Sequence, residues 1–200
     1  MTRLVAFCFF ILQAFAAHGQ DLGPEDLVRK ITQEVLDAIT SDKELAAGDR
    51  QKALKLAEEK VLPHIDFKEA TRLAVGRSWN QASAQQKERL ADEFRRMLVR
   101  TYSSAISSYQ GQTMKVLPVR MKPGDTEATV RNHYIRPGAT PLQIDYSMRK
   151  TDAGWMIYDI VVEGVSLVLT YRSEFDAVMK EQGVDGLIRR LSQKNTPPKI

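Results

Sequence analysis

The sequence predicts an α+β fold in which helices from both ends of the chain pack on one four-stranded antiparallel sheet. Apolar residues recur with helical spacing as far as Gly111. Beyond it their period is two, and β-branched and aromatic residues become common. Short turns separate the segments after this change, and short turns join neighbouring antiparallel strands. Helices packed on a sheet of this kind belong to the α+β class.

The N-terminus has the layout of a secretory signal peptide. Arg3 precedes an unbroken apolar stretch over residues 4–12, and small residues follow it. Cleavage after Ala16 or after Gly19 fits the small-x-small rule, and cleavage after Gly19 is preferred. The apolar stretch is much shorter than the roughly 20 residues that a membrane-spanning helix needs. We therefore expect residues 1–19 to be a signal peptide and residues 20–200 to form a single exported domain.

Cysteine content and charge exclude several functional classes. Cys8 is the only cysteine and lies in the apolar stretch, so the mature chain would have no disulfide, thiolate nucleophile or cysteine-ligated metal. Without Arg3, 28 basic residues accompany 25 acidic ones, and this net charge of +3 favours anionic partners only weakly. Basic runs with interleaved aromatic residues are missing, so nucleic-acid binding is not expected.

The first two helices are predicted from apolar spacing and end signals. Over residues 24–39 apolar side chains recur every four positions, which places them on one helical face. Asp49 is a candidate N-cap for a second helix, and Pro63 obstructs its continuation.

Two further helices begin with capping-box spacing. Asp66 is followed three residues later by glutamate, and its short helix should end near Gly76. Ser83 is followed three residues later by glutamine and begins the longest helix, which extends toward Gly111. The apolar stripe of this longest helix comprises Leu90, Phe94, Met97, Leu98, Thr101, Ala105 and Ile106.

Four strands are expected next, over residues 113–121, 126–136, 142–151 and 155–163. The third strand alternates apolar and polar residues, so one of its faces should be exposed to solvent. The fourth strand is apolar at positions facing both sides, so both of its faces should be covered. Beyond Gly164, further helices should return to pack on the sheet, with the last one after Gly183 and a loose tail at the end.

A search for catalytic residues finds no convincing constellation. His64 and Asp66 straddle a helix break, which favours a helix C-terminal histidine beside an N-cap aspartate over a metal or acid–base site. His133 is expected on a strand surface. Nucleophile-elbow, phosphate-loop and dinucleotide-binding motifs are absent from the sequence.

Asp159 and Glu163 interrupt an apolar stretch at a spacing of four residues. Buried carboxylates need partners or change their pKa. One interpretation makes them an acid–base pair in an apolar pocket. The favoured interpretation is structural, with the carboxylates accepting hydrogen bonds or pairing with arginines such as Arg77, Arg136 or Arg172, since no second catalytic group accompanies them.

Several segments together resemble one protein family. They are YDIVVEGVSLVLTYRSEF over residues 158–175, VLPHIDF over 61–67, GRSW over 76–79, FRRMLVRTY over 94–102 and GVDGL over 183–187. In this order they are similar to the MlaC family, also called toluene-tolerance proteins, which are periplasmic phospholipid carriers. The likeness extends over nearly the whole mature chain.

The resemblance implies N-terminal and C-terminal helices packed on a curved four-stranded antiparallel sheet that encloses an apolar pocket for acyl chains. It also implies a periplasmic carrier that shuttles glycerophospholipid between an outer-membrane lipoprotein–porin complex and an inner-membrane ABC transporter with an MCE-domain subunit. Such a carrier maintains outer-membrane lipid asymmetry, and the lipid is cargo rather than a cofactor. The expected lining residues are Phe94, Met97, Leu98, Tyr102, Tyr134, Tyr146, Trp155, Val161, Val165 and Val168.

Apolar periodicity by itself does not distinguish a lipid-sized cavity from a tightly filled core. Two other classes of protein therefore stay open at this point. One is an enzyme for a small apolar substrate that uses Asp159 or Glu163. The other is a lipid-free periplasmic adaptor with a filled core that binds only proteins.

Overall fold

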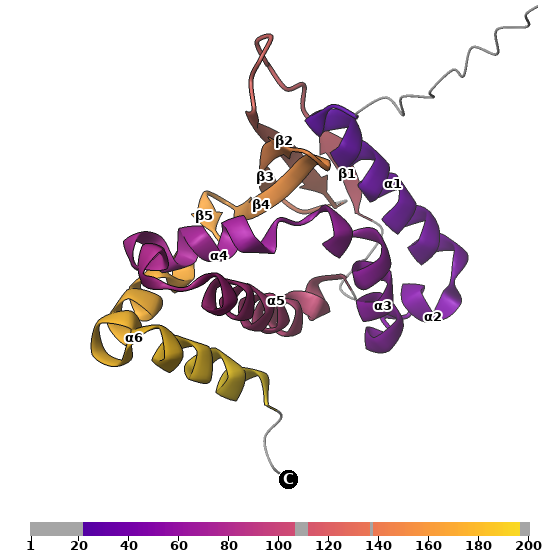
Figure 1. Cartoon of the computed structure of the whole chain (residues 1–200). Coiled ribbons are helices and arrows are strands. Elements are labelled where there is room, and N and C mark those ends of the chain that lie inside the picture. Colours follow the sequence, from indigo (N-terminus) through magenta and orange to yellow (C-terminus); the bar gives the residue numbers. More distant parts are fainter. Residues whose placement is uncertain (1–21, 107–111, 137, 197–200) are drawn as a thin grey trace, which may run out of the picture.

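The computed structural model describes residues 22–106, 112–136 and 138–196, so the predicted signal peptide lies outside them (Figure 1). The helices are α1 Pro24–Ser41, α2 Lys43–Ala46, α3 Arg50–Lys60, α4 Phe67–Val75, α5 Ala84–Ile106 and α6 Arg172–Asn195, with short 3-10 helices η1 Leu62–His64, η2 Gly76–Gln81 and η3 Leu169–Tyr171. The strands are β1 Thr113–Val116, β2 Glu127–Ile135, β3 Leu142–Thr151, β4 Gly154–Val162 and β5 Val165–Ser166.

The helix starts agree with the predicted caps. The Asp49 carboxylate accepts hydrogen bonds from the first-turn amides of α3, and Asp66 accepts one from the Glu69 amide. At the start of α5, Ser83 and Gln86 bind each other's backbone amides reciprocally, which is a complete capping box. The short α2, capped by Asp42, was not predicted because its single turn has no apolar period.

The strands form an antiparallel meander in the order β1-β2-β3-β4-β5. The α+β prediction is confirmed, but the sheet has five strands rather than four, because the chain turns after β4 and pairs two further residues with its end. β1 ends at Val116, well before the predicted Met121. The Leu117 amide still donates to the Arg131 carbonyl on β2, but the Val119 amide donates to the Glu25 carboxylate on α1, so the chain leaves β2 between these two residues.

A β-bulge in β4 changes which side chains face each side of the sheet. Ile157 pairs with Met148 and Asp159 pairs with Ser147, so Tyr158 is an extra residue between them. Side chains facing α1 are therefore odd-numbered before the bulge and even-numbered after it, as at Ile157 and Ile160. All of β4 is buried or half-buried, so the prediction that both faces are covered is confirmed.

The hydrophobic core consists of two clusters. One lies between α1 and the sheet and includes Leu27, Val28, Ile31, Val116, Val130, Met148, Trp155 and Ile157. The other lies among α4, α5 and α6 and includes Leu90, Phe94, Met97, Val168, Phe175, Leu187 and Leu191. The prediction that the C-terminal helices pack on the sheet is wrong for α6: Figure 1 shows it on the side of α5 that is remote from the sheet, because its apolar side chains belong to the helical cluster. α6 bends at Gly183, where a positive φ of 67° interrupts the helix.

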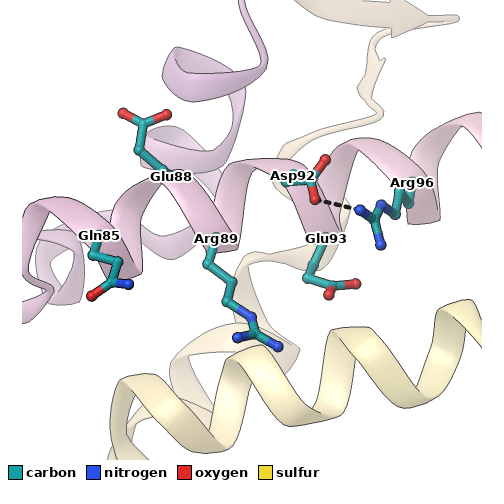
Figure 2. Close-up of a pocket in the computed structure, with 6 residues that line it drawn as sticks. All are labelled: Gln85, Glu88, Arg89, Asp92, Glu93 and Arg96. Carbon is teal, nitrogen blue, oxygen red and sulfur yellow. Dashed lines mark ion pairs between the residues drawn. The ribbon is translucent and has the colours of Figure 1, made fainter.

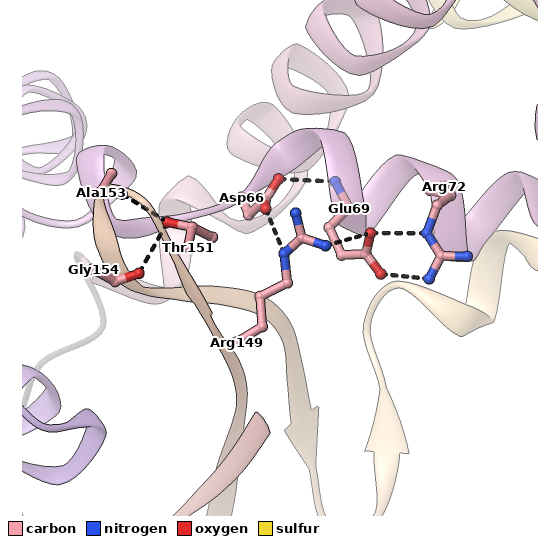
Figure 3. Close-up of polar contacts among 7 residues, drawn as sticks. All are labelled: Asp66, Glu69, Arg72, Arg149, Thr151, Ala153 and Gly154. Atoms are coloured by element: carbon pink, nitrogen blue, oxygen red, sulfur yellow. Dashed lines mark hydrogen bonds and ion pairs between the residues drawn. The ribbon is translucent and has the colours of Figure 1, made fainter. Parts of the chain in front are cut away.

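Polar contacts join the helical layer, at the start of α4, to the sheet (Figure 3). The Ile65 backbone bridges to Ile157 on β4, and the Asp66 amide donates to the Ile157 carbonyl at 2.7 Å. Arg149 on β3 extends to the carboxylates of Asp66 and Glu69 on α4, at 2.9 and 3.1 Å. The start of α4 is thus held against the sheet, while the rest of α4 belongs to the helical layer.

Candidate functional site

The site is an apolar face of the sheet that is covered at one end and open at the other. Strand register places the following side chains on this face: Met114, Val116, Ala128, Val130, Asn132, Tyr134, Leu142, Ile144, Tyr146, Met148, Trp155, Ile157, Ile160 and Val162. Met148 and Val130 are fully buried beneath α1. Toward the other end, Ile144 and Val162 are half-buried and Leu142 is 41% exposed. The apolar face therefore continues from the core toward solvent, and we call it the recess face.

Two tyrosines, Tyr134 and Tyr146, belong to the recess face. Burial raises the pKa of the Tyr146 hydroxyl well above its usual value and also raises the pKa of Tyr134. Both residues nevertheless keep some accessible surface. Both side chains are therefore largely shielded from solvent on this face. Their hydroxyls are hydrogen-bonded to each other, so the polar atoms are satisfied within an otherwise apolar wall.

Asn132 lies on the same face, directly opposite Ile144. It is fully buried, and its Nδ2 donates to the Val130 carbonyl at 3.0 Å. Its Oδ1 has no hydrogen-bond partner among the described residues. An unpaired buried carbonyl oxygen costs about 1–3 kcal/mol. The recess face thus carries, among otherwise apolar side chains, a buried acceptor without a partner in the described part of the chain.

The helical layer also carries half-buried apolar side chains. Leu98 on α5 packs beside the helical core, and Tyr102 lies one turn further along the helix. Burial, with a hydrogen bond to Tyr171, raises the pKa of the Tyr102 hydroxyl to about 12. Phe94 is fully buried and contacts the rings of Tyr171 and Phe175 edge-on, with centroids 5.3 and 5.2 Å away.

The predicted lining residues fall into separate environments. Phe94, Met97 and Val168 are buried in the helical core, with Leu98 against it and Tyr102 further along α5. Tyr134, Tyr146 and Trp155 share the apolar face of the sheet, where Trp155 lies at the buried end.

Val161 and Val165 lie apart from both groups. Val161 pairs with Asp145, so the bulge places it on the opposite face from Tyr146. Val165 is 55% exposed on β5. Sequence reasoning did not include Ile144 and Ile160, whose position on the recess face follows only from the register. The alternation within β3 was the available signal for Ile144.

Asp159 and Glu163 bind the backbone around the β4–β5 turn. Asp159 accepts hydrogen bonds from the Ser166 hydroxyl and the Val168 amide, and its burial raises the pKa of its carboxyl. Glu163 lies in the turn itself at a positive φ of 49° and accepts from the Gln143 amide. These contacts agree with the structural interpretation of both residues, and neither depends on the arginines that the sequence suggested.

His64 and Asp66 have the predicted local roles. His64 ends η1, and Asp66 caps α4. Within residues 22–106, 112–136 and 138–196, no group of three or more His, Cys, Asp or Glu side chains is placed to hold a metal ion. The same residues contain no helix long and apolar enough to cross a membrane.

A shallow groove of about 440 Å³ lies along α5. Its lining consists of Gln85, Glu88, Arg89, Asp92, Glu93 and Arg96. Figure 2 shows Arg89 and Glu93 pointing toward α6, while Asp92 and Arg96 form an ion pair at 2.7 Å. A lining of charged and amide side chains is unsuited to acyl chains, which favour apolar walls.

Known proteins resemble this chain over most of its length. It is 21% identical to the intermembrane phospholipid transport system binding protein MlaC of Haemophilus influenzae, over 96% of this chain and 92% of that protein. It is 22% identical to toluene tolerance protein ttg2D of Pseudomonas putida, over 91% and 83%. The phospholipid-binding protein of Ralstonia solanacearum, solved in complex with a phospholipid, matches with a TM-score of 0.77 and 34% identity, over 87% of this chain and 97% of that one.

The family comparison agrees with these relatives. The model of the MlaC protein family matches residues 29–193, which extend from α1 nearly to the end of α6. The segments that suggested the resemblance all lie inside this match. The chain belongs to the MlaC family.

Proposed function

We propose that the protein is a periplasmic carrier that binds a glycerophospholipid with its acyl chains in the recess. The observation that supports this most directly is the apolar face of the sheet, which continues from the core to the exposed Leu142. The Ralstonia relative, which is described in complex with a phospholipid, supports the same ligand class. In this proposal the protein carries the lipid without chemical change, so Asp159 and Glu163 have no catalytic role.

Apolar burial supplies the binding energy in this proposal. Each buried methylene contributes about 0.8 kcal/mol, so an acyl chain needs a deep apolar wall with few unsatisfied polar groups. The paired hydroxyls of Tyr134 and Tyr146 meet that requirement. The flexible side chain of Met114 at the same face suits chains of different length.

The carrier would exchange lipid with two membrane complexes. We propose that these are an outer-membrane lipoprotein–porin complex and an inner-membrane ABC transporter with an MCE-domain subunit, and that the exchange maintains outer-membrane lipid asymmetry. The named phospholipid transport relative supports a transport role. Co-purification of each complex with the lipid-loaded carrier, followed by transfer of labelled lipid, tests this part separately from binding.

Export is also part of the proposal. Residues 1–19 would be removed and residues 20–200 would form the mature domain. N-terminal sequencing of protein isolated from the periplasm should begin at Gln20. A chain that retains residue 1, or that stays in the cytoplasm, would contradict export.

Native mass spectrometry of protein purified from its own periplasm tests the ligand, with extraction and identification of bound lipid. We expect a stoichiometric phospholipid. A ligand-free protein that also takes up no added phospholipid would overturn the carrier proposal in favour of an adaptor or a small-substrate enzyme.

A matched pair of variants tests the location of the lipid. Ile144→Trp adds bulk to the recess face and should reduce bound lipid, because the larger ring occupies space needed by an acyl chain. Thr129→Trp is the control, since Thr129 is exposed on the opposite face of β2. Equal lipid occupancy in both variants, with both folded by circular dichroism, would place the lipid elsewhere.

A further inference from the structure

A pocket separate from the recess face and from the groove along α5 lies at the C-terminal end of α4, where three helical segments meet. This pocket has a volume of about 250 Å³. It is lined by Arg72, Leu73, Gly76, Arg77, Trp79, Asn80 and Arg172, which come from α4, η2 and the first residue of α6. Trp79 is buried and the arginines are exposed, so guanidinium groups surround an aromatic floor. None of its lining residues belongs to the recess face of the sheet.

The charges of this pocket are unbalanced. Arg72 is paired with the Glu69 carboxylate. Arg77 and Arg172 make no hydrogen bond or ion pair with any residue that the structure describes, and the lining contains no carboxylate. Elsewhere in the chain, arginines such as Arg29, Arg96 and Arg149 pair with acidic side chains. Two guanidinium groups without counterions, facing one pocket, create a local positive potential.

Gly76 fixes the position of one of these guanidinium groups. It has a positive φ of 67°, and a Cβ added there would lie 2.8 Å from Nη2 of Arg172. The Arg172 side chain therefore packs directly on the glycine backbone at the end of α4. The negative end of the helix dipole favours a cation in this place, and the remaining guanidinium N–H groups are left for a ligand.

We propose that this pocket binds a phosphate group, held by Arg77 and Arg172 with help from Asn80. Guanidinium groups donate paired hydrogen bonds whose geometry matches phosphate oxygens. The side-chain amide of Asn80 adds a neutral donor. The group is a phosphate monoester, a phosphodiester or inorganic phosphate, and the site is distinct from the recess that accommodates acyl chains in the carrier proposal.

Trp79 provides a direct readout. The chain has two tryptophans, so a Trp155→Phe background leaves Trp79 as the only indole. Titration with inorganic phosphate, at ionic strength held constant with sodium chloride, should give a saturable fluorescence change. The double variant Arg77→Gln with Arg172→Gln should weaken binding at least about tenfold, because a charge-assisted hydrogen bond contributes more than the free energy of one tenfold step.

Matched variants distinguish phosphate binding at this pocket from general attraction of phosphate to positive charge on the protein. Arg189→Gln removes the same charge from an exposed position on α6 outside the pocket and should leave phosphate affinity within about twofold. Arg172→Lys keeps the charge but loses the planar fork, so its affinity should fall between those of the parent and the double variant. Thermal melts identify any variant that fails to fold. If the double variant fails to fold, the phosphate affinity of the single Arg77→Gln variant is measured instead.

A second experiment, with lipid vesicles, identifies the source of the phosphate group. Co-sedimentation with phosphatidylglycerol vesicles, compared with phosphatidylcholine vesicles, should fall in the double variant if the group belongs to an anionic lipid. Loss of phosphate binding alone would indicate a free phosphate or a soluble ester. Unchanged phosphate and vesicle binding in the double variant, or no saturable signal in the parent, would overturn the proposal. Native mass spectrometry reports lipid in the recess independently.

Discussion

Arg149 Nε lies 2.9 Å from Oδ2 of Asp66, and this contact joins the end of the central strand β3 to the N-cap residue of α4 (Figure 3). Asp66 has a second role, because its Oδ1 caps the helix through the Glu69 amide. The aspartate side chain is mostly buried, whereas the arginine is 39% exposed. The ion pair therefore orients an element that both the helical core and the sheet depend on.

A double-mutant cycle should detect this link. Arg149→Met and Asp66→Asn, separately and together, are expected to show a coupling free energy of about 1 kcal/mol in urea unfolding, because the pair is partly shielded from water. Asparagine retains the capping oxygen, so the cycle isolates the ion pair. The exposed Asp92–Arg96 pair on α5 is the control, with an expected coupling of about 0.3–0.5 kcal/mol. Equal coupling in the two cycles would show that Asp66–Arg149 is an ordinary surface pair.

Asp159 should give the protein a characteristic pH dependence. Burial raises the pKa of its carboxyl in the folded state above the usual value of 3.8. The folded state then binds a proton at pH values where the unfolded chain has released it, so Asp159 stabilises the fold increasingly as pH falls through the folded pKa. In Asp159→Asn this contribution is absent.

The measurement is the free energy of unfolding of the parent minus that of Asp159→Asn, at pH values between neutral and 4. This difference should rise as pH falls. Using a difference removes the opposite contributions of Glu25, Glu34 and Glu69, whose pKa values are lowered mainly by side-chain hydrogen bonds to Arg29, Lys60 and Arg72. A flat difference would mean that the Asp159 carboxyl is hydrated in solution.

Two of the predicted lining residues should differ sharply in their effect on stability. Phe94→Ala removes a fully buried ring from between Tyr171 and Phe175 and should cost about 3–5 kcal/mol. Val165→Ala trims an exposed side chain and should change the free energy of unfolding by less than about 0.5 kcal/mol. Urea titration of lipid-free protein compares them. A small cost at Phe94 would imply that its surroundings collapse readily or that it borders an open space.

Local signals in the sequence predicted much of the fold because they act over a few residues. Ser83 and Gln86 satisfy each other's helix-end amides, and that contact can be inferred from their spacing alone. The shortening of β1 could not be inferred in this way, because it depends on Glu25, which is 94 residues away from Val119. The two-residue β5 likewise depends on the turn at Glu163 and on the Asp159 contacts beyond it.

The candidate site was predictable only in part, for a related reason. Tyr134 and Tyr146 follow from alternation on β2 and β3. On β4 nearly every residue is apolar, so the residue pattern does not show which side chains face which side of the sheet. The bulge at Tyr158 could therefore not be predicted, and Val161 rather than Ile160 was expected on the apolar face. The sequence also could not indicate which apolar side chains fill the core and which border a recess, because that depends on how far α1 extends over the sheet.

The Tyr134–Tyr146 hydrogen bond should show an asymmetric response to loss of each hydroxyl. The two hydroxyls are hydrogen-bonded to each other, and burial raises the pKa of both, that of Tyr146 well above its usual value. Tyr134→Phe leaves the more deeply buried Tyr146 hydroxyl without its partner. Tyr146→Phe leaves Tyr134, which lies nearer the open end of the sheet face opposite Leu142.

Tyr134→Phe is therefore expected to cost more stability than Tyr146→Phe, by about 1 kcal/mol, since an unpaired buried hydroxyl keeps its full desolvation penalty. The double variant should cost less than the sum of the two single variants, because it removes both partners together. Urea unfolding of lipid-free protein measures all three. If the order of the two single variants were reversed, Tyr146 would have access to water in the recess, and the deep end of the recess would be hydrated before lipid enters.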